Sequence, residues 1–332
     1  MKTTEQTLNI SACEWLNILR AAGEVTRLRL LVALSGGELT VGELTRVVEQ
    51  SQPRVSRHLR LLCQSGLLQR FQEGATVFYR LAWQGAGEQL TALTLRMMSR
   101  EDKLFAQDRQ RLAAVREDRG QRATHFFHHN ADNWDSLRTL YAAVDSVENA
   151  LLQAAPKSID MLLDLGTGTG RILEIFSPRI RHGVGIDMSA EMLGVARARM
   201  TGSRFAHCQF RKADATASPY PDACAEVVII HHVLHYLPLP QALIQEAARL
   251  LQPGGRLMIV DFAAHQQERL RTELAHRRLG FADTEIHQWL RNCVLKSICT
   301  QQFSSNEPDG LTTCLWIATT ANTATNLEKI AQ

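Results

Sequence analysis

The sequence predicts two domains, a small and mainly α-helical domain followed by a larger α/β domain built on a parallel sheet. The length of 332 residues allows two domains of about 150 residues each. Apolar residues recur at helical spacing near the N-terminus, whereas after about residue 159 apolar runs typical of strands alternate with helical patterns. Charge divides the chain similarly, since residues 1–122 hold 18 basic and 13 acidic side chains and residues 123–332 hold 19 and 21.

Composition excludes several classes of protein. Hydrophobic residues make up 45% and charged residues 21%, an ordinary globular balance, and the formal net charge is +3. The seven cysteines form no CxxC pair, which argues against a secreted disulfide framework. The N-terminus lacks the apolar segment of a signal peptide. The longest uncharged apolar run, residues 227–240, is shorter than the roughly 20 residues of a membrane helix. We therefore expect a cytoplasmic protein without membrane contact.

The first domain begins with a series of short helices. Residues 12–35 predict two helices, separated by Gly23 and ended by Gly36. Thr40 with Glu43 three residues later has the spacing of a capping box, which predicts a third helix.

A fourth helix begins at Ser51, with Pro53 in its first turn, where a missing amide proton costs nothing. One of its faces is apolar, formed by Val55, Leu59 and Leu62. The other side chains project elsewhere, and they are Gln52, Arg54, Ser56, Arg57 and Arg60. An apolar back with an Arg/Gln/Ser front suits reading of the major groove, because Arg matches guanine and Gln matches adenine.

Two short strands follow, over residues 67–71 and 76–81, and predict a hairpin flanked by Arg70 and Arg80. Helices, turn and hairpin in this order predict a winged helix-turn-helix that binds DNA. The alternative is a small helical interaction domain whose arginines are merely solvated.

Residues 12–83, and especially SQPRVSRHLRLLCQSGLLQR at 51–70, resemble the winged-helix repressors of the ArsR family. The resemblance implies a homodimer on a palindromic, double-stranded operator, with the helix of residues 51–65 in the major groove. The DNA-binding residues that follow from the pattern and the resemblance are Gln52, Arg54, Ser56, Arg57, His58, Arg60, Arg70 and Arg80.

Metal-sensing members of the ArsR family carry a Cys-Val-Cys sequence where this chain has Thr40-Val41-Gly42. The long helix expected over residues 85–118 also lacks His and Cys, so we expect no thiolate metal sensor. Instead, this helix is expected to extend the dimer interface through apolar side chains, namely Leu90, Leu93, Leu95, Met97, Met98, Leu104 and Phe105. The expected domain boundaries are 1–84 for the DNA-binding domain, 85–122 for a dimerisation and connector helix, 123–320 for the α/β domain and 321–332 for a flexible tail.

The α/β domain is predicted from alternating strands and helices, an order that implies parallel strands with right-handed crossovers. The expected strands cover residues 159–165, 183–187, 205–211, 226–230 and 256–261, and the expected helices lie near 171–177, 189–199 and 239–251. A final antiparallel hairpin is expected over residues 294–302 and 312–319. Ligands of such sheets bind beyond the carboxyl ends of the strands.

A glycine-rich loop follows the first of these strands, in the order Asp164-Leu165-Gly166-Thr167-Gly168-Thr169-Gly170. A dinucleotide-binding fold requires GxGxxG, and Arg171 stands where that pattern needs its last glycine. The observed GxGxG after an acid resembles the first motif of class I S-adenosylmethionine-dependent methyltransferases, a Rossmann-like fold with a seven-stranded, mostly parallel sheet.

Later motifs extend this resemblance over roughly residues 125–320. Asp187 ends the second strand, where a carboxylate accepts hydrogen bonds from both ribose hydroxyls, and Asp214 fits the acid near the adenine amino group. Residues 219–238 and the Pro253-Gly254-Gly255 turn match later segments, and the most similar group includes ubiquinone/menaquinone-biosynthesis methyltransferases. The implied cofactor is S-adenosylmethionine, with S-adenosylhomocysteine as product or effector. Its expected contacts are Asp164, Gly166, Thr167, Gly168, Gly170, Asp187, Met188, Asp214, Ala215 and His231.

Other roles remain open for some of these residues. Asp187 taken alone is also a suitable N-cap for the next helix, and Asp214 a common solvated turn residue. The spacing of His231, His232 and His235 imitates a metal site, but the resemblance implies histidines without metal, so we expect none. It also implies that residues 123–141 lie over the cofactor. His125, His128 and His129 would then belong to an entrance lid, and Trp134 or Tyr141 would cover the cofactor.

Methyl transfer is an in-line displacement, so a base is needed only where the acceptor must lose a proton. The candidates for that base are His231, His232 and His235. DNA modification is disfavoured, because the Asn/Asp-Pro-Pro-Tyr sequence of DNA amino-methyltransferases and the Pro-Cys nucleophile for cytosine are absent. Arsenite methylation, which resembles a chemistry of paired thiolates, is disfavoured because Cys208 and Cys224 are the only cysteines near the pocket. Two hypotheses remain: a regulator that senses the methyl cycle through this domain, or a small-molecule methyltransferase whose DNA-binding half controls its own gene. The methyl acceptor is not identified.

Overall fold

The computed structural model describes residues 10–73, 76–82, 85–99, 102–129, 144–274, 276–304 and 310–321. The chain divides into two compact units, the first comprising residues 1–121 with 200–207 and the second the rest. Within the described ranges, no helix is both long enough and apolar enough to cross a membrane.

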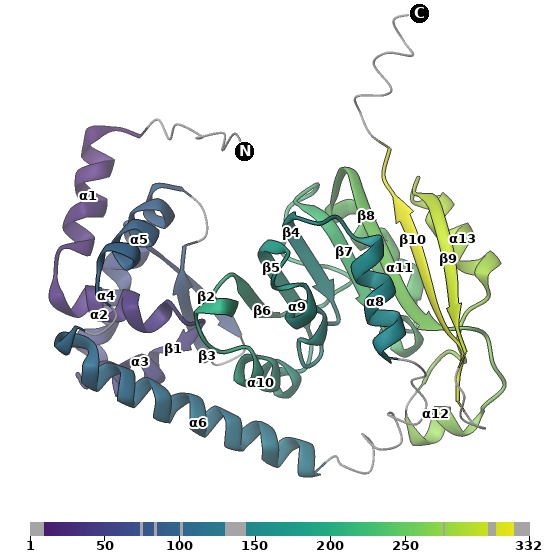
Figure 1. The fold of residues 1–332 in the computed structure, drawn as a ribbon, viewed down its shortest axis with the longest axis horizontal. Coiled ribbons are helices and arrows are strands. Elements are labelled where there is room, and N and C mark those ends of the chain that lie inside the picture. The colour runs from purple at the N-terminus through teal and green to yellow at the C-terminus, as the bar shows by residue number, and fades with distance from the viewer. Residues whose placement is uncertain are drawn as a thin grey trace, which may run out of the picture. The chain divides into compact units, whose positions relative to one another are not determined.

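The first unit is mainly helical (Figure 1). Its helices are α1 (Ala12–Ala22), α2 (Val25–Leu34), α3 (Val41–Val48), α4 (Gln52–Gln64), α5 (Gly85–Met97) and α6 (Ala106–His129). Its antiparallel sheet has the order β1-β3-β2, formed by β1 (Leu39–Thr40), β2 (Leu68–Glu73) and β3 (Thr76–Leu81). The predicted helix-turn-helix with its hairpin wing is confirmed, and the two-residue strand β1 is an addition that the sequence pattern did not indicate.

Local hydrogen bonds explain where α3 begins. The backbone N–H of Glu43 donates to the Thr40 hydroxyl at 3.2 Å, and the Glu43 carboxylate accepts from the backbone N–H of Thr40 at 2.7 Å. This is the predicted capping box, and it satisfies two backbone donors that the helix itself leaves unpaired. The helix then packs its apolar face into the core of the unit, where Leu44 and Val47 are fully buried.

The single helix expected over residues 85–118 is wrong. Helix α5 ends at Met97, a short 3₁₀ helix η1 (Lys103–Phe105) follows, and α6 begins at Ala106. Asp102 stabilises the new start, because its carboxylate accepts from the backbone N–H of Leu104 at 2.8 Å. Two residues expected at a dimer interface, Leu90 and Phe105, are 9% and 3% exposed, so they pack inside the unit.

Ion pairs hold α6 against the helices of the same unit, two of them with several short hydrogen bonds. Arg29 of α2 donates two hydrogen bonds of 2.7 Å to the carboxylate of Asp108. Arg119 donates to both carboxylate oxygens of Glu43, at 2.7 and 2.6 Å. Burial by itself would raise the pKa of Glu43, but Arg119 and the bonds from Thr40 outweigh it and the pKa is lowered. The charged segment that the sequence predicts as a connector is therefore partly a structural member of the first unit.

The second unit contains a seven-stranded sheet in the order β6-β5-β4-β7-β8-β10-β9 (Figure 1). The strands are β4 (Ile159–Leu165), β5 (Ile180–Asp187), β6 (Cys208–Lys212), β7 (Ala225–His231), β8 (Leu251–Phe262), β9 (Lys296–Phe303) and β10 (Thr313–Thr319). Strands β4 to β8 are parallel, and β10 runs antiparallel to both β8 and β9. The predicted Rossmann-like sheet with an antiparallel edge hairpin is confirmed.

Helices connect and cover these strands. They are α8 (Val144–Ala154), α9 (Arg171–Phe176), α10 (Ala190–Arg199), α11 (Pro240–Leu250), α12 (Arg269–Glu273) and α13 (Asp283–Asn292), with the 3₁₀ helices η2 (Ser203–Phe205) and η3 (Leu234–Tyr236). The chain passes from β4 to β5 on one side and later places β7 on the other. The order of strands thus reverses at β4, and the crevice beyond its carboxyl end is where such sheets bind ligands.

Candidate functional site

A pocket of about 610 Å³ opens at the carboxyl ends of β4, β5 and β7. Its wall is formed by the glycine-rich loop, the residues after each strand and part of α8. Nine of the ten residues expected to contact a cofactor line it, namely Asp164, Gly166, Thr167, Gly168, Asp187, Met188, Asp214, Ala215 and His231. The sequence motifs therefore converge on one concave site.

The glycine-rich loop requires glycine at these positions. Gly166, Gly168 and Gly170 have φ values of 82°, 52° and 80°, the left-handed region that favours glycine. A Cβ atom at Gly166 would lie 2.3 Å from the side chain of Val233, whereas one at Gly168 would meet nothing within 4 Å. Gly170 is the exception among the expected contacts. It caps the N-terminus of α9 and packs near Phe210 instead of lining the pocket.

Asp164 places a buried carboxyl group at the pocket wall. Its side chain is 0% exposed, and its Oδ2 accepts a 2.6 Å hydrogen bond from the hydroxyl of Thr167. Its Oδ1 has no hydrogen-bond partner among the described residues. Burial raises the pKa of Asp164 to about 7. A buried acceptor is rarely left unpaired, so this oxygen is suited to a donor group of a ligand.

Asp187 links the end of β5 to the loops on either side of it. Its Oδ2 accepts from the backbone N–H of Gly168 at 2.8 Å, which ties the end of β5 to the glycine loop. Its Oδ1 accepts from the backbone N–H of Ser189 at 2.8 Å, ahead of α10. The N-cap of α10 is Ser189, whose hydroxyl accepts from the backbone N–H of Met192 at 3.1 Å, so the N-cap alternative for Asp187 is wrong, and its side chain lines the pocket.

Asp214 is oriented by its own turn. Its Oδ1 accepts from the backbone N–H of Thr216 at 2.8 Å and from the Thr216 hydroxyl at 2.7 Å. The residue is exposed and lines the pocket. The turn therefore holds the carboxylate at the wall, and a ligand would compete only for its second oxygen.

Sequence reasoning missed the contribution of α8. Val144, Val147 and Glu148 line the pocket, and the Glu148 carboxylate accepts two 2.7 Å hydrogen bonds from Arg171. No motif covers these residues, so only packing reveals them. Trp134 and Tyr141, together with the side chains of His125, His128 and His129, lie outside the described part of the chain.

The three candidate bases differ in position. His231 and His232 line the pocket, and burial lowers the pKa of His231 to about 4. His235 does not line it, because its side chain is wholly buried and its Nδ1 is bonded to Asp261 Oδ1 at 2.7 Å. The expectation that His235 reaches an acceptor in the pocket is thus corrected, and His231 and His232 remain.

The surface expected to bind DNA lies on α4. Val55, Leu59 and Leu62 are fully buried beneath it. Among the expected contacts, Gln52, Arg54, Arg57, Arg60 and Arg70 are exposed and Ser56 is half-buried.

Two of the expected DNA contacts are placed differently. Arg80 is 7% exposed, and its guanidinium donates to the side chain of Gln69 at 2.9 and 2.6 Å. His58 turns toward Glu24, with 3.4 Å between Nδ1 and the carboxylate. Both expectations are corrected, because Arg80 is buried against Gln69 and His58 is paired with Glu24, so the unit itself holds both side chains.

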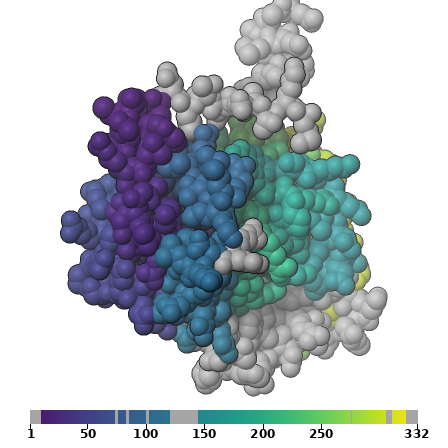
Figure 2. Space-filling model, turned by 60° about the vertical axis from the view of Figure 1, so that its left-hand side comes forward, coloured from purple at the N-terminus to yellow at the C-terminus, as the bar shows by residue number. Residues whose placement is uncertain are grey.

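An apolar surface is exposed on the first unit. Trp15, Leu16 and Leu19 of α1 are 38%, 47% and 39% exposed, and Figure 2 shows this helix, in dark purple, at the surface. Helix α5 contacts α1 and leaves Leu93 and Met97 47% and 78% exposed. Exposed apolar side chains on two adjoining helices are typical of a surface that binds another protein.

Comparison with known proteins agrees with both units. Residues 24–70 match the model of the bacterial regulatory protein arsR family, and residues 163–259 match that of a methyltransferase domain. A ubiquinone/menaquinone biosynthesis C-methyltransferase of Ruegeria sp. is 36% identical over 112 residues, which cover 33% of this chain and 45% of that protein. A malonyl-[acyl-carrier protein] O-methyltransferase of Marinomonas sp. is 26% identical over 208 residues, 61% of this chain and 74% of that protein.

Solved structures share the fold. A chain from the complex between the Haloferax volcanii Trm112 methyltransferase activator and a methyltransferase superposes with a TM-score of 0.50 at 19% identity, covering 61% of this chain and 98% of that one. The chain spans less than half the length of the first curated relatives it matches. The chain therefore matches two family models in succession, that of the bacterial arsR regulatory family at residues 24–70 and that of a methyltransferase domain at residues 163–259.

Proposed function

We propose that this chain is a DNA-binding transcriptional regulator, a repressor, whose second unit binds S-adenosylmethionine or S-adenosylhomocysteine. The observation that carries the cofactor assignment is the pocket itself. It combines a glycine loop open to a ligand at Gly168 with two carboxylates, Asp164 and Asp187, at the ends of neighbouring strands. The arginines of α4 carry the DNA assignment.

The residues present fit this cofactor. The unpaired Oδ1 of Asp164 is suited to an ammonium group, and Asp187 to ribose hydroxyls, which are both donors. Asp214 and Met188 lie on the same wall, where an adenine ring has a carboxylate and an apolar side chain as neighbours. These hydrogen-bonding groups suit S-adenosylmethionine, the cofactor expected from the sequence, which has no pyrophosphate.

When bound, the cofactor would supply an electrophilic methyl group. The chain would contribute alignment and exclusion of water, because the wall is largely apolar around Val147, Val233 and Leu237. Where the acceptor must lose a proton, His231 or His232 is the base at the wall. A pKa as low as that of His231 makes the imidazole neutral at pH 7 and only a weak base, which suits an acceptor that is itself acidic.

The DNA-binding form is proposed to be a homodimer on a palindromic operator in the cytoplasm. The exposed side chains of α1 and α5 supply an apolar surface for pairing two copies. Two such copies would present two α4 helices, which is how helix-turn-helix dimers read half-sites one helical turn apart.

Two versions of this function remain distinct. In the first, the second unit senses the methyl cycle and its ligand alters operator binding. In the second, it methylates a small molecule, as the names of its relatives describe for them, and the first unit controls its own gene. Asp164, Asp187 and Asp214 all line the pocket, so the residues that a working cofactor site requires have not been lost.

Fluorescence anisotropy on the chain's own promoter separates the two versions. The measurement is made at fixed salt without ligand, with S-adenosylmethionine and with S-adenosylhomocysteine, since affinity for DNA is uninterpretable without the salt concentration. A tenfold shift, about 1.4 kcal/mol, is expected for the sensor. Operator binding that ignores both ligands would exclude the sensor and leave the enzyme.

Cofactor binding is tested separately by calorimetry. Asp187→Ala is expected to lower affinity for S-adenosylmethionine by about 2–4 kcal/mol, since charge-assisted hydrogen bonds are lost. The control is Asp160→Ala, an exposed carboxylate on β4 whose side chain is 69% accessible. Equal affinity in the wild type and Asp187→Ala would contradict the cofactor assignment.

A further inference from the structure

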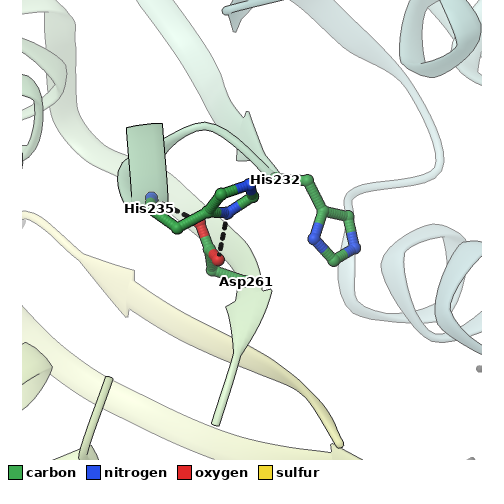
Figure 3. Close-up of side chains that lie close together, drawn as sticks. All are labelled: His232, His235 and Asp261. Carbon is green, nitrogen blue, oxygen red and sulfur yellow. Dashed lines mark hydrogen bonds and ion pairs between the residues drawn. The ribbon is translucent and has the colours of Figure 1, made fainter. Parts of the chain in front are cut away.

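A group of imidazoles lies beside the pocket wall, and only part of it is used by the proposed methyl transfer. His232 and His235 follow β7. Asp261 is the penultimate residue of β8, and His265 and His276 follow that strand. We call these five residues the imidazole cluster. Figure 3 shows three of them, with the His235 ring bonded to the Asp261 carboxylate. The ring of His276 lies 4.3 Å from that of His235, centroid to centroid.

Several nitrogens of the imidazole cluster are unpaired. His276 is 2% exposed, and neither of its ring nitrogens has a hydrogen-bond partner among the described residues. The same holds for Nε2 of His235, which is 0% exposed, and for Nε2 of His265. A neutral imidazole carries one donor and one acceptor nitrogen, and leaving them buried without partners is costly. Such a concentration of unpaired nitrogens is suited to binding a ligand.

Three members of the cluster have the spacing of a metal site. His232, His235 and Asp261 each offer one ligand atom, and these atoms all lie within 4.8 Å of one another. Ligand atoms of a tetrahedral zinc ion, with bonds of about 2.0–2.2 Å, lie roughly 3.5 Å apart. The His235–Asp261 pair, hydrogen-bonded at 2.7 Å, is closer than this and would exchange its hydrogen bond for bonds to the ion, whereas the wider separations would shorten.

The backbone holds His232 in an uncommon conformation. Its φ is 54°, in the left-handed region, and its N–H donates to the carbonyl of Val260 at 2.8 Å. Non-glycine residues adopt this conformation at a cost and cluster at functional sites. Val260 immediately precedes Asp261, so the same bond fixes His232 beside the strand that supplies the carboxylate.

We propose that His232, His235 and Asp261 form a binding site for a divalent transition-metal ion of the zinc class, a role that replaces the expectation of no metal drawn from the sequence. Two imidazoles and one carboxylate are the donor set that zinc accepts with a further position open. Magnesium and calcium prefer sites made of oxygen atoms. His276, the other fully buried imidazole, supplies a nitrogen to the ion or to a water bound to it.

The site adjoins the proposed cofactor pocket, because His232 belongs to both. Metal binding is nevertheless measured without cofactor, methyl acceptor or DNA. The metal site and the proposed function can therefore fail independently.

The test is a titration of the untagged full chain, freed of metal by a chelator, with Zn²⁺ in a calorimeter and with Co²⁺ in a spectrophotometer. One equivalent of each ion is expected to bind, and Co²⁺ is expected to give the visible bands of a nitrogen- and oxygen-ligated tetrahedral site. Zn²⁺ is expected to displace Co²⁺ and abolish those bands.

Variants locate the site. His232→Gln and Asp261→Asn are each expected to weaken Zn²⁺ binding by about 100-fold or more. The matched control is His287→Gln on α13, a half-buried imidazole bonded to Thr300 at 3.2 Å, which should bind Zn²⁺ as the wild type does. Circular dichroism verifies that each variant is folded. If Asp261→Asn unfolds, His232→Gln, at the rim of the cluster, still tests the location of the site.

Three outcomes would overturn the proposal. They are failure to bind one equivalent, binding that His232→Gln leaves unchanged, and an intense near-ultraviolet sulfur-to-cobalt band, which would assign the ion to cysteines. Loss of binding in the His287→Gln control to the same degree as in His232→Gln would also exclude this location.

Discussion

Asp164, the penultimate residue of β4, has a wholly buried carboxyl group, and its position explains its altered acidity. Thr167 is its one hydrogen-bond partner among the described residues, so little compensates the loss of hydration. Burial is the largest influence on its pKa, and the nearby charge of Asp187 raises it further. An aspartate after a strand is readily found in the sequence, but its acidity depends on the chain that packs around it.

The pH dependence of stability should report this carboxyl group. Between the unfolded pKa of 3.8 and the folded value of about 7, the native state holds a proton that the unfolded chain releases. Its contribution to stability is therefore complete below pH 4 and is lost as the pH rises through 7. Asp164→Asn should remove this loss. Between pH 4 and pH 8, the free energy of unfolding of the variant should therefore rise relative to that of the wild type by up to about 4 kcal/mol.

Urea unfolding at several pH values, followed by tryptophan fluorescence, measures this difference. Asp160→Asn, an exposed carboxylate on the same strand, is the control and should keep the wild-type pH profile. A constant difference between Asp164→Asn and the wild type across this range would contradict the raised pKa.

Arg57 is the arginine of α4 for which we expect the clearest effect on DNA binding. It is exposed on the helix whose opposite face is fixed in the core by Leu59. Arg57→Ala should weaken operator binding by about 1–3 kcal/mol if the side chain reads a base. Arg181→Ala removes the same charge from an exposed site in the second unit and should change affinity little. A loss equal for operator and random DNA would instead assign Arg57 to a phosphate.

At the scale of single elements, the helices of the first unit follow local rules where their ends are polar. The α3 capping box is satisfied by two residues three positions apart, and the same pair of interactions begins α1 at Ser11 and Glu14. The apolar periodicity of this segment does not indicate the break between α5 and α6. It depends on Phe105 being drawn into the interior of the unit.

Removing the α3 cap should destabilise the first unit measurably. Thr40→Ala is expected to cost about 1 kcal/mol, because one backbone donor of the first turn loses its acceptor. Thr45→Ala is the matched control. Its hydroxyl bonds back to the carbonyl of Val41 within the helix, so its removal should be neutral or slightly stabilising. Chemical denaturation followed by circular dichroism compares them, and equal stability of the two variants would argue against the cap.

At the scale of the whole molecule, the two units combine a DNA-binding surface with a ligand pocket in one chain. The first unit has its own hydrophobic core, and the chain divides into two compact units. If the proposed sensing occurs, the coupling between the two units is measured by the effect of ligand on operator binding.

The proposed homodimer gives a prediction at this scale. Leu16→Glu combined with Leu19→Glu should shift the chain toward a monomer and weaken operator binding, since charges would be buried at an apolar interface. Sedimentation equilibrium measures the shift. Leu61→Glu alters an equally exposed leucine on α4 and should leave the association unchanged. A double variant that still sediments as the wild type does would place the interface elsewhere.

Features encoded over a few neighbouring residues were determined by the sequence alone. Strand β4 begins and ends where its apolar run does, at Ile159 and Leu165, and the glycine loop follows because glycine adopts its backbone angles at the least cost. The parallel order of the sheet follows from the alternation of strands and helices. These features are local because periodicity, capping and turn geometry depend on short-range sterics and hydrogen bonds.

Only the tertiary structure decided which polar side chains face a ligand and which are held inside. It buried Arg80 against Gln69, paired His235 with Asp261 across 26 residues, and brought Glu148 of α8 to the pocket. Burial and pairing of this kind depend on segments distant in the chain, whose desolvation and contacts no local pattern records. That is why the sequence indicated the pocket, while the imidazole cluster and the metal site proposed there came only from the folded chain.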